Sequence, residues 1–207
     1  TWYLIHMTAG GLLEYEITDG YSGPGDYSSA TGNNAVNDNE WHFISVLFDR
    51  DDAGLIYVDG ELDVSGTISS HSGDLSNNEP LEIGVDLNHV TQYIDGKLDN
   101  IVLWNRLLTE EEIQAYMSTP PDGNEEGLTS HWKFNSGDGD VLYDHSGNAN
   151  HGTINGATWS EDIYVPPYNG PEWFVSVDGN ESNDGSQELP FASIQTAINS
   201  ANNGHIV

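Results

Sequence analysis

The sequence predicts an all-β protein, an antiparallel jelly-roll sandwich with one short helix, followed by a C-terminal strand-loop-helix. Three observations lead to this prediction. Short runs rich in β-branched and aromatic residues recur between turn residues, seven Asp-Gly pairs punctuate the chain, and a single helical pattern interrupts the runs. Such spacing is typical of sandwiches and jelly rolls rather than of βαβ units.

Six runs in the first part of the chain are predicted strands. They are Trp2 to Ile5, Leu12 to Thr18, Trp41 to Asp49, Leu55 to Asp59, Leu81 to Val85 and Leu98 to Trp104. The fourth run ends on Asp59-Gly60, a pair suited to the positive φ angles of a tight hairpin turn. We therefore expect the chain to reverse direction there.

The helical pattern begins at Thr109. Its side chain can cap the helix, with Glu112 three residues on, and the acidic first turn favours the positive end of the helix dipole. Ile113, Tyr116 and Met117 form one apolar face. Pro120-Pro121 is expected to end the helix.

Two further pieces follow a linker at 121–126. In the piece 127–165, strand-like runs at Leu128 to Phe134 and Gly152 to Trp159 flank a turn-rich loop. The piece 166–207 begins with Trp173 to Val177 as a predicted strand. A helix is then expected to start at Pro190, with apolar residues at helical spacing, and to end at Gly204.

Composition excludes several classes of function. The 207 residues include 34 acidic and four basic ones, for a net charge of -30. Phosphate binding needs clustered Lys and Arg, so nucleic acid is not an expected partner, and neither is an anionic membrane surface. No apolar run of about 18 residues predicts membrane insertion. Without cysteine, disulfides and thiolate chemistry are also excluded.

The aromatic content predicts a folded core despite the charge, since six Trp, ten Tyr and five Phe are spread along the chain. Self-repulsion at this charge must be screened by salt or neutralised by bound cations. A saline habitat or bound Ca²⁺ is therefore one expectation. A solvated acidic surface without a specific ion is the other. We also expect the protein to be bacterial and to lie outside the cell or at its surface.

Four ordered segments carry a resemblance to a known family. They are Glu40 to Asp49, Ile56 to Gly60, Tyr93 to Arg106 and Leu108 to Ile113. Together they resemble the second half of a laminin-G-like module of the concanavalin A-like lectin/glucanase type. The resemblance implies a jelly roll at 1–120 that lacks its first strands.

Later segments resemble the missing strands of the same family. They are Gly127 to Phe134 and Asp144 to Ala157. Either a second module begins here, or these strands fold back and complete the module at 1–120. We favour the second alternative, because unfilled strand positions leave apolar edges exposed.

The end of the chain carries another resemblance. Trp173 to Ser186, with Pro190 to Ile198, resembles the N-terminal cap of pectate-lyase-like right-handed parallel β-helix proteins. In that family catalytic carboxylates or lysines come from later coils, which would lie beyond Val207. Because both ends fall within strand-like runs, we expect the chain to be part of a longer, multidomain protein.

The laminin-G-like resemblance also implies a calcium site. In relatives such an ion often lies where the Asp-x-Ser-Gly loop meets the closing strand, which nominates Asp144, Asn148 and Asn150 with Asp99. The alternative is that Asp144 only caps a turn and that Asp99 faces solvent.

Catalytic patterns are missing from the sequence. No Glu-x-Asp-x-x-Glu motif of retaining glycosidases occurs, and the eight histidines are scattered, so catalytic residues are predicted to be none. We interpret His42 as a packed or hydrogen-bonded strand residue. Aromatic rings could stack on sugars at Tyr21, Tyr27, Tyr93 or Trp104, although each is more often a core residue.

These observations leave three hypotheses for function. The first is a secreted, non-catalytic module, stabilised by Ca²⁺, that binds a polysaccharide or cell-surface glycan. The second is a structural spacer or adhesin segment without a ligand of its own. The third is an accessory domain of a polysaccharide lyase. The sequence does not identify the ligand.

Overall fold

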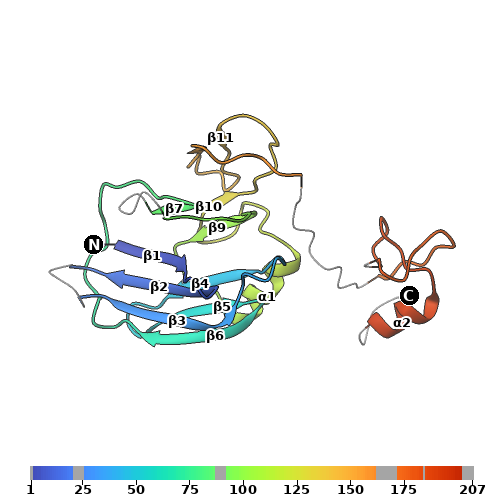
Figure 1. The fold of residues 1–207 in the computed structure, drawn as a ribbon, viewed down its shortest axis with the longest axis horizontal. Helices are drawn as coiled ribbons and strands as arrows, with labels where there is room; N and C mark the ends of the chain where they lie inside the picture. The colour runs from blue at the N-terminus through green and yellow to red at the C-terminus, as the bar shows by residue number, and fades with distance from the viewer. Residues whose placement is uncertain (1, 21–25, 87–91, 162–171, 184, 202–207) are drawn as a thin grey trace. The chain divides into compact units, whose positions relative to one another are not determined.

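The computed structural model describes residues 2–20, 26–86, 92–161, 172–183 and 185–201 (Figure 1). The chain divides into two compact units, Thr1–Tyr164 and Val165–Val207. The first unit consists mostly of antiparallel strands with one helix, which confirms the predicted all-β jelly-roll class. No helix in the described ranges is long and apolar enough to cross a bilayer.

The first sheet contains three strands in the order β1-β2-β3. They are β1 (Trp2–Met7), β2 (Leu12–Thr18) and β3 (Ser28–Ala35). Burial alternates strictly along most of β2, because one face of the sheet meets the core and the other does not. The strands β1 and β2 were predicted, whereas β3, with its small polar residues, was not.

The second sheet also contains three strands, in the order β4-β5-β6. They are β4 (Ile44–Phe48), β5 (Ala53–Val58) and β6 (Glu61–Thr67). Between β5 and β6, Asp59 and Gly60 adopt φ angles of 51° and 81°. The predicted hairpin turn is therefore confirmed.

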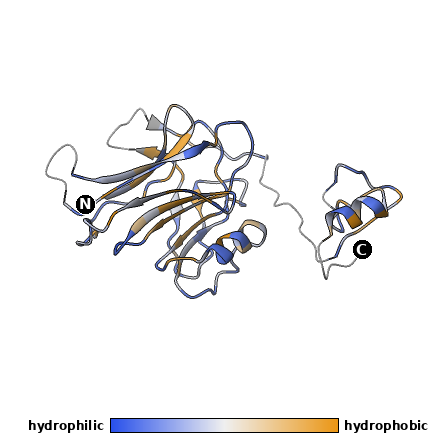
Figure 2. Cartoon of the chain, turned by 90° about the horizontal axis from the view of Figure 1, so that it is seen from below, coloured by the Kyte–Doolittle hydropathy of each residue, from blue (hydrophilic) through white to orange (hydrophobic). Residues whose placement is uncertain are grey.

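The core lies between these two sheets. Leu13, Tyr15 and Ile17 of β2 form one cluster with Ile56 and Val58 of β5. The hydroxyl of Tyr15 donates to the carbonyl oxygens of Gly54 (3.2 Å) and Gly66 (2.9 Å) in the second sheet. A single buried side chain thus fixes the spacing of the sheets. Figure 2 shows the apolar residues, in orange, along the strands.

The two sheets also meet at their edges, where β3 lies beside β6. No ladder joins these edges. Instead the carboxylate of Asp63 accepts the backbone N–H groups of Asn33 (2.9 Å) and Asn34 (3.1 Å). The side chains of Asn33 and Asn34 donate to the backbone and carboxylate of Asp63 as well, both at 2.6 Å. We call this arrangement the Asp63 clasp.

Three two-stranded pairings complete the first unit. β9 (Ile101–Trp104) pairs antiparallel with β10 (Leu128–Trp132), so a strand of the piece 127–165 lies against a strand of the piece 1–120. β7 (Val85–Asp86) pairs with β8 (Gln92–Tyr93), and β11 (Val141–Leu142) with β12 (Gly152–Thr153). The strands predicted at Leu81 to Val85 and Gly152 to Trp159 are much shorter than expected.

Helix α1 (Glu110–Ser118) begins as predicted. The Thr109 side chain accepts the N–H of Glu112, and the Glu112 carboxylate accepts the N–H of Thr109 (2.9 Å). Both carboxylate oxygens of Glu112 also accept from Arg106, at 2.8 Å each. Arg106 is the main reason that the pKa of Glu112 falls to about 2. Ile113 is fully buried.

The second unit is small. Trp173 stacks on Phe191 with ring centroids 5.9 Å apart, and both pack against Ala197 of α2 (Ile194–Ser200). The predicted strand at Trp173 to Val177 is only a bridge between Val175 and Phe191. Ser193, not Pro190, caps the helix. Gly204 lies outside the described residues, and the likeness to a β-helix cap stays a prediction.

Candidate functional site

The Asp144 loop contains three of the four residues nominated for calcium. The carboxylate of Asp144 accepts the backbone N–H groups of His131 (2.8 Å), Ser146 (2.9 Å) and Asn150 (2.9 Å), and the hydroxyl of Ser146 (2.8 Å). Burial alone would raise the pKa of Asp144, but these four hydrogen bonds outweigh it and hold the pKa at about 2. The carboxylate is therefore a buried anchor of the loop.

The side chains of the two nominated asparagines also form hydrogen bonds within the protein, as donors. The amide NH₂ groups of Asn148 (3.0 Å) and Asn150 (3.1 Å) donate to the carbonyl oxygen of Thr129. The hydroxyl oxygen of Ser146 also lies 3.0 Å from this carbonyl oxygen, so its one proton is shared between Thr129 and Asp144. These side chains tie the loop to β10.

This arrangement does not fit a calcium ion well. Ca²⁺ binds six to eight oxygen atoms, whereas the oxygens of Asp144 already accept from four protein donors. Asp99 accepts the N–H of its neighbour Asn100 (2.9 Å) instead of joining the loop network. The geometry favours the turn-capping alternative, and calcium binding at Asp144, Asn148, Asn150 and Asp99 stays a prediction.

His131 lies beneath this loop and is fully buried. Its Nε2 lies 3.4 Å from the side-chain oxygen of Asn100, and its Nδ1 has no hydrogen-bond partner among the described residues. Burial, followed by repulsion from Lys133, lowers the pKa of His131 to about 4. His131 is therefore neutral at physiological pH and belongs to the core.

His42 is hydrogen bonded, in agreement with its interpretation as a structural residue. Its Nδ1 lies 2.8 Å from a carboxylate oxygen of Asp59, and its Nε2 lies 3.1 Å from one of Asp38. The bond to Asp59 is the main cause of a raised pKa at His42. Nδ1 thus holds the β5-β6 turn, and Nε2 contacts Asp38 in the segment before β4.

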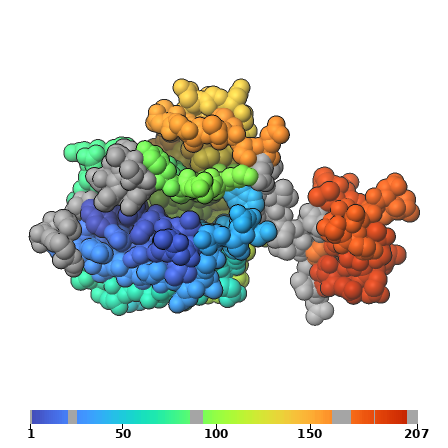
Figure 3. All heavy atoms as spheres, in the orientation of Figure 1, coloured from blue at the N-terminus to red at the C-terminus, as the bar shows by residue number. Residues whose placement is uncertain are grey.

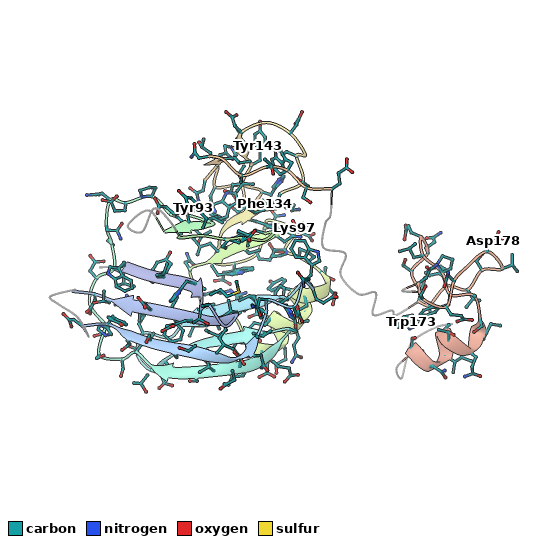
Figure 4. The ribbon with its side chains drawn as sticks, viewed as in Figure 1. Tyr93, Lys97, Phe134, Tyr143, Trp173 and Asp178 are labelled. Atoms are coloured by element: carbon teal, nitrogen blue, oxygen red, sulfur yellow. The ribbon has the colours of Figure 1, made fainter. Side chains whose placement is uncertain are left out.

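The aromatic residues considered for sugar stacking differ in accessibility. Trp104 is partly buried and its ring already has two partners, because it stacks on Tyr116 at 5.3 Å and lies 5.1 Å from the Arg106 guanidinium. Tyr93, which is labelled in Figure 4, is 67% exposed. Tyr27 is 38% exposed and has an aromatic partner, described below. Tyr21 lies outside the described residues.

The face of the first sheet that points away from the core carries aromatic, histidine and glutamate side chains. We call it the outer face. The register pairs Leu4 with Glu16 and His6 with Glu14, so these four side chains share it. Its members are Trp2, Leu4 and His6 on β1, Leu12, Glu14, Glu16 and Thr18 on β2, and Ser29 and Thr31 on β3. In Figure 3 these first strands, in blue, form a continuous part of the surface.

One end of the outer face is aromatic. The rings of Trp2 and Tyr27 lie 6.1 Å apart at an angle of 38°. Trp2 is paired with Thr18, which is fully buried, and Tyr27 immediately precedes β3. Apolar ring surface therefore lies beside the polar middle of the same face.

The middle of the outer face contains a histidine and two carboxylates. Nε2 of His6 lies 3.8 Å from Oε2 of Glu14 and 3.8 Å from Oε1 of Glu16. The ligand atoms of the three residues lie within 4.8 Å of one another, and no other such group of three is found in the ranges that the structure describes. Ser29 and Thr31 are exposed beside them.

Sequence reasoning missed this group. The available signal was Glu14-Tyr15-Glu16 within a strand, where alternation places both acids on one face. His6 joins them only because the hairpin between β1 and β2 brings it opposite Glu14. That register is not visible in the strand pattern alone.

Comparison with known proteins identifies the family. Residues 1–114, more than half of the chain, match a laminin-G family model of the concanavalin A-like lectin/glucanases superfamily. The chain therefore belongs to this superfamily. No curated protein matches it.

Two solved structures are similar. A "putative carbohydrate binding protein" from Bacteroides ovatus matches with a TM-score of 0.57 and 18% identity, over 75% of this chain and 48% of that one. At this identity the likeness shows the fold alone. An S-layer domain-containing protein from Clostridium thermocellum has 19% identity, coverage of 51% of each chain and a TM-score of 0.29, too low to support an argument. The chain spans about half the length of each.

Proposed function

We propose that the first unit is a carbohydrate-binding module, non-catalytic by itself, of a secreted protein that carries further domains. The aromatic pair beside carboxylates on the outer face is the observation that carries this proposal. Membership of a superfamily that contains lectins, and the description of the Bacteroides ovatus protein as carbohydrate binding, support it. A polysaccharide or cell-surface glycan is the proposed ligand.

The outer face suits a sugar chain for two chemical reasons. Pyranose rings have apolar faces that stack on aromatic rings such as those of Trp2 and Tyr27. Sugar hydroxyls donate to carboxylates, and hydrogen bonds to ionised acceptors are stronger than neutral ones. Glu16 and Glu14 offer such acceptors two and four residues along β2 from Thr18, which lies opposite Trp2. Apolar and polar contacts can thus act on neighbouring sugar units.

The test is affinity electrophoresis against cell-wall and algal polysaccharides, followed by Tyr27→Ala and Trp2→Ala. An aromatic stacking contact contributes about 1 kcal/mol, so each variant is expected to weaken binding about fivefold to tenfold. Tyr93→Ala is the matched control, because Tyr93 is more exposed and lies on another sheet. Equal retention of the Tyr27 variant and wild type would contradict the proposed face.

Failure of every polysaccharide to retard the wild-type protein would instead favour the other roles. One is a spacer or adhesin segment without its own ligand. The other is an accessory domain of a polysaccharide lyase, a role that depends on the resemblance of the second unit to a β-helix cap. Both roles predict that variants of the outer face behave like wild type in every binding assay.

Glycoside hydrolysis is a second candidate, favoured by Glu14 and Glu16. Retaining glycosidases use two carboxyl groups about 5–5.5 Å apart, and the nearest ligand atoms of these two lie within 4.8 Å. Release of reducing ends from a retained polysaccharide would support this activity if Glu14→Gln and Glu16→Gln both abolish it. Binding without such release supports the non-catalytic module.

A further inference from the structure

We propose that His6, Glu14 and Glu16 form a binding site for a divalent transition-metal ion, with Zn²⁺ as the reference ion. The inference concerns the metal alone and does not depend on sugar binding. It rests on the convergence of three metal-ligating side chains on adjacent strands, and on a histidine nitrogen that has no other partner.

The first argument is the state of the histidine nitrogen. Nε2 of His6 is inaccessible to solvent and has no hydrogen-bond partner among the described residues, although its side chain is 36% exposed. Its distance of 3.8 Å from each glutamate oxygen is too long for a hydrogen bond, which spans about 2.7–3.2 Å. A buried polar atom without a partner costs free energy, so a partner between the three groups is expected.

The second argument is electrostatic. Glu14 and Glu16 lie on one face with side chains 20% and 22% exposed, in a chain of net charge -30. Two carboxylates this close repel each other, and the protein has only four Lys and Arg residues to offset such repulsion. A divalent ion between the oxygens removes the repulsion and supplies the missing partner of Nε2.

The third argument is the spacing of the ligand atoms. Zinc binds imidazole nitrogen and carboxylate oxygen at about 2.0–2.2 Å, so two ligands of one tetrahedral ion lie roughly 3.3–3.6 Å apart. The two nitrogen–oxygen separations of 3.8 Å are slightly wider than this, and all three ligand atoms lie within 4.8 Å of one another. Small rotations of the glutamate side chains would bring all three atoms onto one ion.

The choice of metal follows from the donor set. One imidazole and two carboxylates suit zinc and related first-row transition metals, whereas Ca²⁺ and Mg²⁺ prefer oxygen ligands only. The sheet also fixes the ligands in advance, because Leu13, Tyr15 and Ile17 between and beside the glutamates are buried in the core. Three protein ligands of a tetrahedral ion leave a fourth position for water.

The environment of His42 provides an internal comparison. It also faces two carboxylates, those of Asp38 and Asp59, but each ring nitrogen is within hydrogen-bond distance of one of them. No atom of His42 lacks a partner, and its two carboxylates approach opposite sides of the ring. His42→Gln therefore removes a histidine between two acids without removing a metal site.

The test is isothermal titration calorimetry of the metal-free full chain with ZnCl₂ in 0.15 M NaCl, without any sugar. The site predicts saturable binding of one ion, weakened at least tenfold by His6→Gln, Glu14→Gln or Glu16→Gln and less than twofold by His42→Gln. Excess Mg²⁺ should not compete. Titration with Co²⁺ gives a second readout, since visible absorption bands that disappear in His6→Gln report direct nitrogen ligation.

Three results would overturn the inference. They are binding that does not saturate, binding by His6→Gln equal to wild type, and equal losses in His6→Gln and His42→Gln. Each would identify the ion as part of a general attraction to the acidic surface. Circular dichroism of each variant shows whether the sheet is intact. Because no sugar is present, failure here leaves the proposed glycan binding unaffected.

Discussion

Replacing Asp144 by alanine is expected to destabilise the first unit by about 3 kcal/mol. Two of the N–H groups that the carboxylate accepts, those of His131 and Ser146, are buried. An unsatisfied buried donor costs about 1–3 kcal/mol, which gives about 2–6 kcal/mol before the loop relaxes and admits water. Against a typical stability of about 5–15 kcal/mol, the loss is large.

Urea unfolding followed by tryptophan fluorescence measures this loss. Trp132 is a suitable local reporter, because its indole N–H donates to the carbonyl oxygen of Asn150 in the same loop (2.9 Å). Asp138→Ala, at an exposed position of the same unit, controls for the removal of one negative charge and should change stability by less than about 0.5 kcal/mol. A value for Asp144→Ala as small as that of the control would refute the reasoning.

The same variant separates the loop anchor from the calcium prediction. If the carboxylate serves only the loop, EGTA leaves the melting temperature of the wild-type protein unchanged, and Asp99→Ala stays close to wild type. If calcium is bound, EGTA lowers the melting temperature, and the effect disappears in both Asp144→Ala and Asp99→Ala. We expect the first outcome, because four protein donors already engage Asp144.

Two further predictions concern buried groups. The folded-state pKa of His131, about 4, lies below its ordinary value of 6.5, so the folded state resists protonation and stability falls as the pH drops from 6.5 towards 4. Between pH 7 and 4.5 the free energy of unfolding, measured with urea, should fall by about 2 kcal/mol more in wild type than in His131→Asn. The same pH dependence of this free energy in both proteins would contradict the prediction. Separately, a Cβ at position 54 would lie 2.5 Å from Cζ of Tyr15. Gly54→Ala should therefore cost about 2–3 kcal/mol in thermal unfolding, whereas Gly20→Ala, with nothing within 4 Å, should not.

Much of the fold could be predicted because local chemistry and tertiary structure agree there. Residues within the element itself determine its conformation in three cases. These are the Asp59-Gly60 turn, the Thr109 cap and the alternating pattern of β2. β3 could not be predicted in this way, since Ser28–Ala35 has no β-branched residue except Thr31 and no aromatic one. Its strand conformation comes from pairing with β2 and from contacts with β6.

The candidate sites likewise differ in how far they could be predicted, depending on whether their residues are close in the sequence. The sequence placed Asp144, Asn148 and Asn150 together correctly, because they belong to one short loop, but it could not show that backbone N–H groups occupy the carboxylate. His6, Glu14 and Glu16 were missed because their meeting depends on the register of a hairpin. A one-residue slip would send the glutamates to the core.

The Asp63 clasp has a consequence for how copies of this protein meet. An unprotected edge strand is a template on which a second chain can add its own strand, and such addition leads to fibrils. At the edge of β3, the N–H groups of Asn33 and Asn34 are already taken by an aspartate of the adjoining sheet. An incoming strand would have to displace a negatively charged carboxylate that accepts three hydrogen bonds. The clasp thus protects this edge of β3 against strand addition as well as joining the sheets.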